Sequence, residues 1–262
     1  MASSIITLIT DFGDRDGYVG AMKGVMLGIL PEVPIVDISH NIEPQNIDSA
    51  AFVVGTTYKF FPVGTIHVVV VDPGVGSERR VMAVSAFGQV FLAPDNGTLG
   101  YVLSDCPSAK VYHVSNTNYF LRTVSHTFHG RDIFAPVAAH LAKGLGIEDL
   151  GAPIYDYKIG RIPKLLERDN EIGGEIIYVD RFGNLVSNVP LNQLRRFDES
   201  TLKITIGQLT IDGLVESYFA GKPREPLALI GSAGYLEIAI NSGNAQKELN
   251  CEVGEPVKVY GS

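Results

Sequence analysis

The feature that most constrains the fold is a run of four valines, 68–71, followed at once by Asp72-Pro73-Gly74. The run has no alternation of apolar and polar residues, which predicts a strand buried on both faces inside a parallel sheet. Pro73 removes a backbone donor and Gly74 permits positive φ, so the strand must end there. Asp72 is therefore expected at the carboxyl end of a strand, where open α/β sheets bind their ligands.

A second charged residue, Arg79, follows Asp72 on the same loop or on the next strand. A carboxylate and a guanidinium at one edge of a sheet are suited to polarise a water molecule or to hold a polar substrate. The alternative is a turn aspartate and a surface arginine, because Asp-Pro-Gly is common turn chemistry.

The segments around the valine run alternate between strand and helix patterns, which predicts a parallel sheet with right-handed crossovers. The expected strands are 4–10, 33–39 and 65–71, and the expected helices are 18–30 and 48–60. Further elements are expected as a hairpin over 81–93, a turn at 94–97, a strand over 110–114 and a helix over 130–143. Pro136 would kink or shorten that last helix.

The composition of the chain changes after residue 151, where proline and charged residues become more frequent and the apolar periodicity fades. We therefore predict an α/β domain over 1–152, with a largely parallel sheet, a linker over 153–170 and a smaller domain over 171–262. Short apolar runs separated by glycine turns predict a β-barrel or sandwich for the smaller domain. These runs are 175–179, 202–206, 208–211, 227–230, 236–240 and 257–260.

Composition narrows the classes of protein that fit. With 45% hydrophobic and 19% charged residues in 262, the chain can bury a core. Its formal net charge of -8 argues against a nucleic-acid groove. Cys106 and Cys251 make neither a metal pattern nor a disulfide framework, which favours a reducing compartment. The N-terminus has no signal-peptide pattern and no apolar run approaches the roughly 20 residues of a membrane span, so we expect a cytoplasmic protein without a membrane partner.

Two more motifs of the first domain carry polar groups suited to chemistry. Asp11 ends the first predicted strand, where a carboxylate can accept hydrogen bonds from a ribose diol; the alternative is a capping or turn aspartate. His129 precedes a predicted helix and can orient or deprotonate a water near neutral pH, while Gly130 lets a substrate approach the backbone. A structural histidine is the alternative. A metal site with His126 lacks the further Cys, His or acidic ligands that it would need, so we expect no metal.

The second domain contains two motifs of the same kind. Asp180 and Asn184, on a tight turn with Phe182 and Gly183, suit the ammonium and carboxylate of an amino acid; the alternative is an Asx β-turn. The glycine-rich stretch 231–241 feeds a strand, and its backbone groups could read a purine edge; the alternative is a turn of the barrel.

Taken together, the order and the residues of six motifs resemble those of the S-adenosyl-L-methionine (SAM) hydroxide adenosyltransferases, the hydrolytic relatives of fluorinase and chlorinase. The resemblance extends from Ile6 to about Tyr260. The motifs are Thr10–Gly13, Val71–Gly76, Ala93–Gly97, Thr127–Pro136, Asp180–Asn184 and Gly231–Asn241.

The resemblance implies an enzyme that cleaves SAM with water to adenosine and L-methionine, with SAM as substrate and no cofactor. It implies an α/β domain followed by a β-barrel domain, and a homotrimer whose active sites lie between the first domain of one subunit and the second domain of its neighbour. The catalytic triad of the family falls on Asp72, Arg79 and His129.

The same resemblance implies substrate-binding positions in both domains. Asp11 matches the ribose-diol position and Phe128 an aromatic residue near the reacting centre. The positions implied are Asp11, Phe128 and Gly130 in the first domain, Asp180 and Asn184 for the methionine portion and the base, and Ser232, Tyr235, Glu237 and Ala239 in the adenine-contacting segment.

Two alternatives to hydrolysis follow from the same motifs. Fluorinase has a halide-contacting serine at the position of Gly130, but chlorinase has glycine there. The halogenases also place a tyrosine where this chain has Asp72, and a carboxylate beside the nucleophile would repel a halide, which favours hydrolysis. The second alternative is a sensor that binds adenosine or SAM without turnover.

Overall fold

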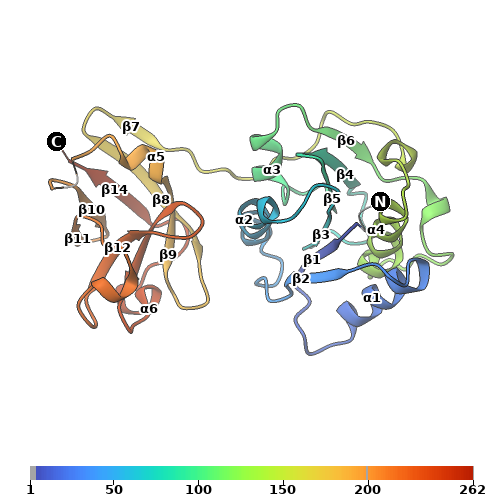
Figure 1. The fold of residues 1–262 in the computed structure, drawn as a ribbon, viewed down its shortest axis with the longest axis horizontal. Coiled ribbons are helices and arrows are strands. Elements are labelled where there is room, and N and C mark those ends of the chain that lie inside the picture. The colour runs from blue at the N-terminus through green and yellow to red at the C-terminus, as the bar shows by residue number, and fades with distance from the viewer. Residues whose placement is uncertain (1–3, 199, 262) are drawn as a thin grey trace. The chain divides into compact units, whose positions relative to one another are not determined.

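The computed structural model describes residues 4–198 and 200–261 and contains two compact units, which meet in sequence between Ile162 and Pro163 (Figure 1). The predicted linker, 153–170, spans this point, and a short strand, β7 (Leu166–Arg168), lies within it and pairs with the second unit's β8. Within the described ranges, no helix is long and apolar enough to cross a membrane.

The first unit is built on a six-stranded sheet in the order β2-β1-β3-β5-β4-β6. Strands β2, β1, β3 and β5 are mutually parallel, while β4 is antiparallel to both β5 and β6, so the predicted, largely parallel sheet is confirmed. The strands are β1 (Ile6–Thr10), β2 (Ile35–Ser39), β3 (Ile66–Val70), β4 (Val81–Ala86), β5 (Gln89–Pro94) and β6 (Lys110–His113).

Helices cover both faces of this sheet (Figure 1). α1 and α4 pack on one face in one hydrophobic cluster, and α2 and α3 pack on the other face in a second cluster. The α-helices are α1 (Tyr18–Ile29), α2 (Ile47–Thr57), α3 (Gly100–Asp105) and α4 (Ala135–Ala142), and 3-10 turns cover Tyr58–Phe60, Thr117–Tyr119 and Ile147–Leu150.

The valine run lies at the centre of the sheet, as its composition predicts. Val68 and Val70 belong to the cluster under α1 and α4, whereas Val69 and Val71 belong to the cluster under α2 and α3. Successive side chains of a strand point to opposite faces, so a strand covered by helices on both sides needs apolar residues at every position.

Strand order places a ligand site at one edge of this sheet. The chain runs from β1 to β2 on one side and then crosses to β3 on the other, so the connections diverge between β1 and β3. Thr10 of β1 lies opposite Val70 of β3. Asp11 and Asp72 therefore leave the sheet at the same edge, outside the carboxyl ends of two adjacent strands, where open α/β sheets bind ligands.

The predicted helix over 130–143 is corrected by the structure. Gly130–Phe134 form a π-helical turn, and α4 starts at Ala135. Pro136 lies in the first turn of α4, and the Asp132 carbonyl four residues earlier, which a proline cannot bond, accepts from the Leu121 N–H instead.

The second unit is an antiparallel sheet in the order β11-β10-β14-β8-β9-β13-β12. Its end strands β11 and β12 approach each other, so the sheet curls into a nearly closed barrel. The elements are β8 (Glu171–Val179), β9 (Leu185–Pro190), α5 (Leu191–Leu194), β10 (Lys203–Ile206), β11 (Leu209–Asp212), a 3-10 turn (Tyr218–Ala220), β12 (Pro226–Ile230), β13 (Tyr235–Ile240), α6 (Ala245–Leu249) and β14 (Pro256–Tyr260).

One strand of this barrel, β9, is absent from the sequence prediction. Ser187 and Asn188 interrupt its apolar pattern, yet both are buried. Ser187 Oγ donates to the Leu236 carbonyl at 2.9 Å, and Asn188 Oδ1 accepts from the Glu175 N–H at 2.8 Å. These bonds offset the cost of burying polar groups, which a pattern of hydrophobicity does not reveal.

Candidate active site

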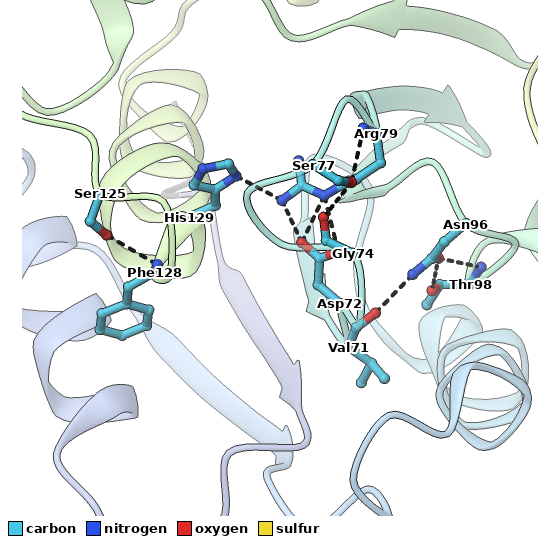
Figure 2. A network of polar contacts seen from close by, with 10 residues as sticks. All are labelled: Val71, Asp72, Gly74, Ser77, Arg79, Asn96, Thr98, Ser125, Phe128 and His129. Carbon is cyan, nitrogen blue, oxygen red and sulfur yellow. Dashed lines mark hydrogen bonds and ion pairs between the residues drawn. The ribbon is translucent and has the colours of Figure 1, made fainter.

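Asp72, Arg79 and His129 meet in one polar network (Figure 2). Arg79 Nε donates to Asp72 Oδ1 at 3.0 Å and to Oδ2 at 2.8 Å, and Arg79 Nη2 also bonds Oδ2. The same Nη2 lies 2.8 Å from His129 Nδ1. The side chains of Arg79 and Asp72 are only 10% and 5% exposed, so the guanidinium joins the carboxylate to the imidazole out of bulk water.

The contact with Arg79 fixes the protonation of His129. An arginine N–H can only donate, so His129 Nδ1 must present a lone pair, and the proton of the neutral ring lies on Nε2. Burial lowers the pKa of His129, and the charge of Arg79 lowers it further, against the opposing effect of Asp72. The imidazole is therefore neutral near pH 7, with one N–H to donate.

The loop after β3 is held by hydrogen bonds at both ends. Asn96 Nδ2 donates to the Val71 carbonyl at 2.9 Å, directly before Asp72 (Figure 2). Ser77 Oγ donates to the Gly74 carbonyl at 2.7 Å and accepts from the Arg79 N–H at 3.3 Å. These bonds turn the chain back so that Arg79 faces the carboxylate.

A close backbone approach brings the His129 segment to this loop. Gly76 has φ +80°, and a Cβ at this position would lie less than 3.0 Å from the His126 carbonyl oxygen. Glycine is the residue that accepts both the positive φ and the contact. The loop 74–79 therefore packs backbone to backbone against 126–129.

The His129 segment is stabilised from its other side by a buried acid. Asp132, which is fully buried, accepts from the Ser125 N–H at 2.8 Å and from Arg131 Nε at 2.6 Å, and Ser125 Oγ accepts from the Phe128 N–H at 3.0 Å. Burial raises the pKa of Asp132, but the bonds from Arg131 and Ser125 outweigh it and the pKa is lowered. The charged Asp132 thus fixes the turn that presents His129.

A cavity of about 690 Å³ opens beside the network, and Asp72 and His129 belong to its lining. Its volume is typical of sites for small-molecule ligands. Asp11 lines the same cavity, and its Oδ2 accepts from the Gln45 N–H at 2.8 Å. The lining comprises Asp11, Phe12, Tyr18, Pro44, Gln45, Val70, Asp72, Pro73, Val75, Ser125, Thr127, Phe128, His129, Gly130 and Arg131.

Three aromatic rings, those of Phe12, Tyr18 and Phe128, pack against one another in this lining. The ring centroids are 5.8 Å apart for Phe12–Tyr18 and Phe12–Phe128, and 5.2 Å apart for Tyr18–Phe128. A Cβ at Gly130 would lie 3.2 Å from Met22 Sδ and 3.3 Å from Phe128. The buried Gly130 therefore leaves the rings their space.

The sequence predicts Phe128 as a site residue but misses Tyr18, Phe12 and Gln45. Tyr18 begins α1 and lies in a pattern that reads as an ordinary amphipathic helix. Gln45 has φ +66°, which is uncommon for a residue other than glycine. For Phe12, the only indication in the sequence is that it follows Asp11 in the motif Thr10–Gly13.

In the second unit, Asp180 and Asn184 form the Asx turn that the sequence left as an alternative. Asp180 Oδ1 accepts from the N–H groups of Phe182 and Asn184, both at 2.8 Å, and Oδ2 accepts from Asn184 Nδ2 at 2.8 Å. The turn leaves the Phe182 ring 74% exposed.

The remaining predicted residues lie on β13 and the turn before it. Ser232 is exposed in the turn, Tyr235 begins the strand and Ala239 is fully buried. Glu237 is also buried, and its Oε2 accepts from the Tyr218 hydroxyl at 2.7 Å, a partner that the sequence does not indicate. Burial raises the pKa of Glu237, and nearby Asp180 raises it further, against the lowering effect of the Tyr218 bond.

The surroundings of His129, which was weighed with His126 as a metal ligand from the sequence, are polar and cationic. Among residues 4–198 and 200–261, no three His, Cys, Asp or Glu side chains are placed to hold a metal ion. His129 Nδ1 instead faces the cationic Arg79, whose charge would repel a metal ion.

Comparison with known proteins identifies the family. Models of the SAM hydroxide adenosyltransferase N-terminal and C-terminal domains match residues 6–151 and 174–258. The chain belongs to the SAM hydroxide adenosyltransferase family. The resemblance drawn from the six sequence motifs is thus confirmed.

Members of this family and its relatives match nearly the whole chain. The (R)-S-adenosyl-L-methionine hydrolase of Methanocaldococcus jannaschii is 35% identical over 266 residues, which cover 97% of this chain and 95% of that protein. A fluorinase of an Actinoplanes species is 30% identical over 288 residues, covering 97% of each. The crystal structure of an uncharacterized conserved protein from Thermotoga maritima matches with a TM-score of 0.92 and 35% identity, covering 98% of this chain and 100% of that one.

Proposed function

We propose that this chain hydrolyses SAM to adenosine and L-methionine by attack of a water molecule on the ribose 5′ carbon. The observation that carries the proposal is the Asp72–Arg79–His129 network, which opens onto a cavity that Asp11 also lines. Family membership and relatives named (R)-S-adenosyl-L-methionine hydrolase support the same reaction.

The chemistry needs a nucleophile more than an acid. The sulfonium leaves as a neutral thioether, so the leaving group takes no proton, whereas bulk water has a pKa of about 15.7. In the proposed mechanism, His129 Nε2–H orients the water, and Asp72 accepts the proton that the water loses. The new C5′–O bond forms as the C5′–S bond breaks, sulfur keeps the electron pair, and one proton passes to solvent from Asp72.

Arg79 acts between these two groups. Its guanidinium holds Asp72 through two donors and His129 through one, so the carboxylate and imidazole are fixed relative to each other before substrate binds. Positioning of this kind lowers such barriers by several kcal/mol, up to about 7–11 kcal/mol. The guanidinium also stabilises negative charge that develops on the attacking oxygen.

The rest of the cavity suits a cationic nucleoside. The faces of aromatic rings attract cations, so Phe12, Tyr18 and Phe128 favour the sulfonium. We assign Asp11 to the ribose 2′ and 3′ hydroxyls, which would fix the ribose beside the activated water.

Asp72 is the feature that favours water over halide as the nucleophile. Its carboxylate lines the cavity with a side chain that is 5% exposed, so its charge is poorly screened there. A halide entering beside it would meet direct repulsion, whereas a water molecule gains a proton acceptor.

Isotope labelling tests the reaction directly. Purified protein is incubated with SAM in ¹⁸O-labelled water containing chloride, and the nucleoside is analysed by mass spectrometry. We expect labelled adenosine and L-methionine in amounts exceeding the enzyme. 5′-Chloroadenosine would refute hydrolysis in favour of halogenation, and one bound nucleoside per chain without further turnover would identify a sensor.

The residues predicted to bind the methionine portion and the base belong to the second unit. We propose that Asp180, Asn184, Ser232, Tyr235, Glu237 and Ala239 complete the site of a neighbouring chain in a homotrimer. The turn of Asp180 offers polar groups and the exposed Phe182 ring for such contacts, and β13 offers further polar groups.

Mixing inactive subunits tests this arrangement. Asp72→Ala and Asn184→Ala chains are unfolded together and refolded, so that mixed oligomers form. If each site combines two chains, the mixture regains part of the wild-type rate, while either variant refolded alone does not. A monomeric mass by light scattering, or no regain of activity, would exclude the shared site.

We further propose that the enzyme needs no cofactor and works in the cytoplasm. The reaction balances with SAM and water alone. Cys106 and Cys251 are free thiols, which fits a reducing compartment. Activity that survives exhaustive dialysis against a chelator, and recovery of the protein in the cytosolic fraction of its own cells, are the expected results.

A further inference from the structure

Three side chains, those of Asp37, His40 and Thr10, form a polar network that reaches the backbone N–H of Phe12, next to Asp11. Asp37 Oδ1 lies 3.0 Å from His40 Nε2, His40 Nδ1 lies 2.9 Å from Thr10 Oγ1, and Thr10 Oγ1 accepts from the Phe12 N–H at 3.3 Å. Thr10 is fully buried and the His40 side chain is 11% exposed. This network thus links β2, through Asp37, and the residue that follows it, His40, to the turn that contains Asp11.

The direction of these bonds follows from the donors available. Thr10 Oγ1 accepts the Phe12 N–H, so its own proton is free to point at His40 Nδ1. The ring then carries its proton on Nε2, next to the Asp37 carboxylate, at ion-pair distance although the N–H is not aligned for a hydrogen bond. The donors and acceptors of Thr10 and His40 are thus assigned. Asp72, Arg79 and His129 take no part in this network.

Asp37 is itself anchored to a helix. Lys23 Nζ of α1 lies 2.5 Å from Asp37 Oδ2. Burial raises the pKa of Asp37, but the nearby Lys23 and His40 side chains outweigh it and the pKa is lowered. A charged Asp37 therefore holds the His40 ring in the orientation that faces Thr10.

Backbone contacts bind the same two segments together. The Gly13 N–H donates to the His40 carbonyl at 2.7 Å, and the Gln45 N–H donates to Asp11 Oδ2 at 2.8 Å. Gln45 reaches Asp11 with φ +66°, an uncommon conformation that clusters at functional sites. Residues 37–45 thus pack along the turn 10–13, and Pro44 and Gln45 at the end of this segment also line the cavity.

We propose that His40 is a positioning residue for ribose recognition, acting through Thr10 to fix the turn that carries the Asp11 carboxylate. The proposal rests on the proposed function, in which Asp11 binds the ribose diol. The ring of His40 holds the Thr10 hydroxyl, the hydroxyl holds the Phe12 N–H, and Asp11 lies between these two backbone positions. Without the ring, the turn loses the support that reaches it through Thr10, while the Gln45 N–H and the backbone bond between Gly13 and His40 remain.

The test measures how well the full-length protein distinguishes adenosine from 2′-deoxyadenosine, by calorimetric titration with each. The ratio of the two Kd values reports the diol contact and not overall stability. We expect His40→Ala to lower this ratio about tenfold, because a misplaced carboxylate no longer rewards the 2′ hydroxyl. His113→Ala, which alters a histidine at the end of β6 outside the cavity lining, should leave the ratio unchanged.

Conservative variants separate positioning from packing. The Oδ1 of asparagine falls near the place of histidine Nδ1, so His40→Asn should retain most of the ratio, whereas His40→Gln, which extends toward Asp37, should not. Thr10→Val is isosteric and removes only the hydroxyl, so it supplies the same test if His40→Ala does not fold.

Two failures are distinguishable. An unchanged ratio in Asp11→Ala would show that Asp11 does not bind the diol, which removes the assignment on which the inference rests. A ratio that falls in Asp11→Ala but stays at the wild-type value in both His40→Ala and Thr10→Val would overturn the positioning role alone.

Discussion

The contact between Gly76 and His126 gives the sharpest prediction about how the triad is assembled. Substituting Gly76→Ala adds one methyl group at a residue with φ +80°, less than 3.0 Å from the His126 carbonyl oxygen. An L-residue in this left-handed region costs about 1–2 kcal/mol before any contact is counted. We therefore expect the variant to be less stable and its loop to move away from the His129 segment.

The size of the movement can be worked from the contact. A carbon and a carbonyl oxygen in contact lie about 3.3–3.6 Å apart, so relief of the overlap requires a shift of roughly 1 Å. That shift separates Arg79 Nη2 from His129 Nδ1, which are 2.8 Å apart in the native protein. Misplacement of a catalytic group by about 1 Å lowers rates on the order of 100-fold.

The assay is steady-state SAM hydrolysis together with thermal unfolding. The matched control is Gly144→Ala, which has φ +107° and open space around its Cβ, so it carries the backbone strain without the collision. We expect both variants to lose stability and only Gly76→Ala to lose kcat strongly. If the two folded variants have kcat values within twofold of each other, the Gly76 contact does not set the triad geometry.

Three further predictions concern the triad and a buried histidine. Asp72→Ala and His129→Ala should each lower kcat by about 10²–10⁴-fold while the calorimetric Kd for SAM changes little; unchanged turnover in both would remove the triad. Arg79→Lys keeps the charge but loses the fork that binds two partners, so kcat should fall at least about tenfold, and a wild-type rate would mean that charge alone suffices. Burial lowers the pKa of His67 from 6.5 to about 4. Between those pH values the unfolded chain binds more protons than the native one, so the unfolding free energy should fall as pH drops, by about 3 kcal/mol in total. Denaturant titrations at several pH values should show a flatter dependence for His67→Gln, and equal slopes would contradict the assignment.

Much of the architecture follows from local pattern. Val68–Val71 predicts a central strand because apolar residues at every position are needed where helices cover both faces. The prediction is weaker where polar residues are buried with partners from distant strands, as for Ser187 and Asn188 of β9. It also misplaced the start of α4, because a single π-helical turn of five residues is too short to show a period of its own.

The triad and Asp11 of the candidate site were predictable from the sequence, but their arrangement was not. Asp72, Arg79, His129 and Asp11 were identifiable in the sequence as polar residues at strand ends and turns, and as motifs of one family. The sequence does not show that these residues lie close together. Their proximity depends on the register that sets Thr10 of β1 opposite Val70 of β3, and on the packing of loop 74–79 against 126–129.

The sequence alone shows which residues have reactive side chains and which predicted strands they follow, since both depend on residue type and on periodicity along the chain. The tertiary structure alone decided that Arg79 joins Asp72 to His129, that His129 presents its Nε2–H, and that His40 supports the turn of Asp11. Those contacts join residues between 7 and 50 positions apart. Their geometry depends on how strands and loops pack together, and no local pattern records that packing.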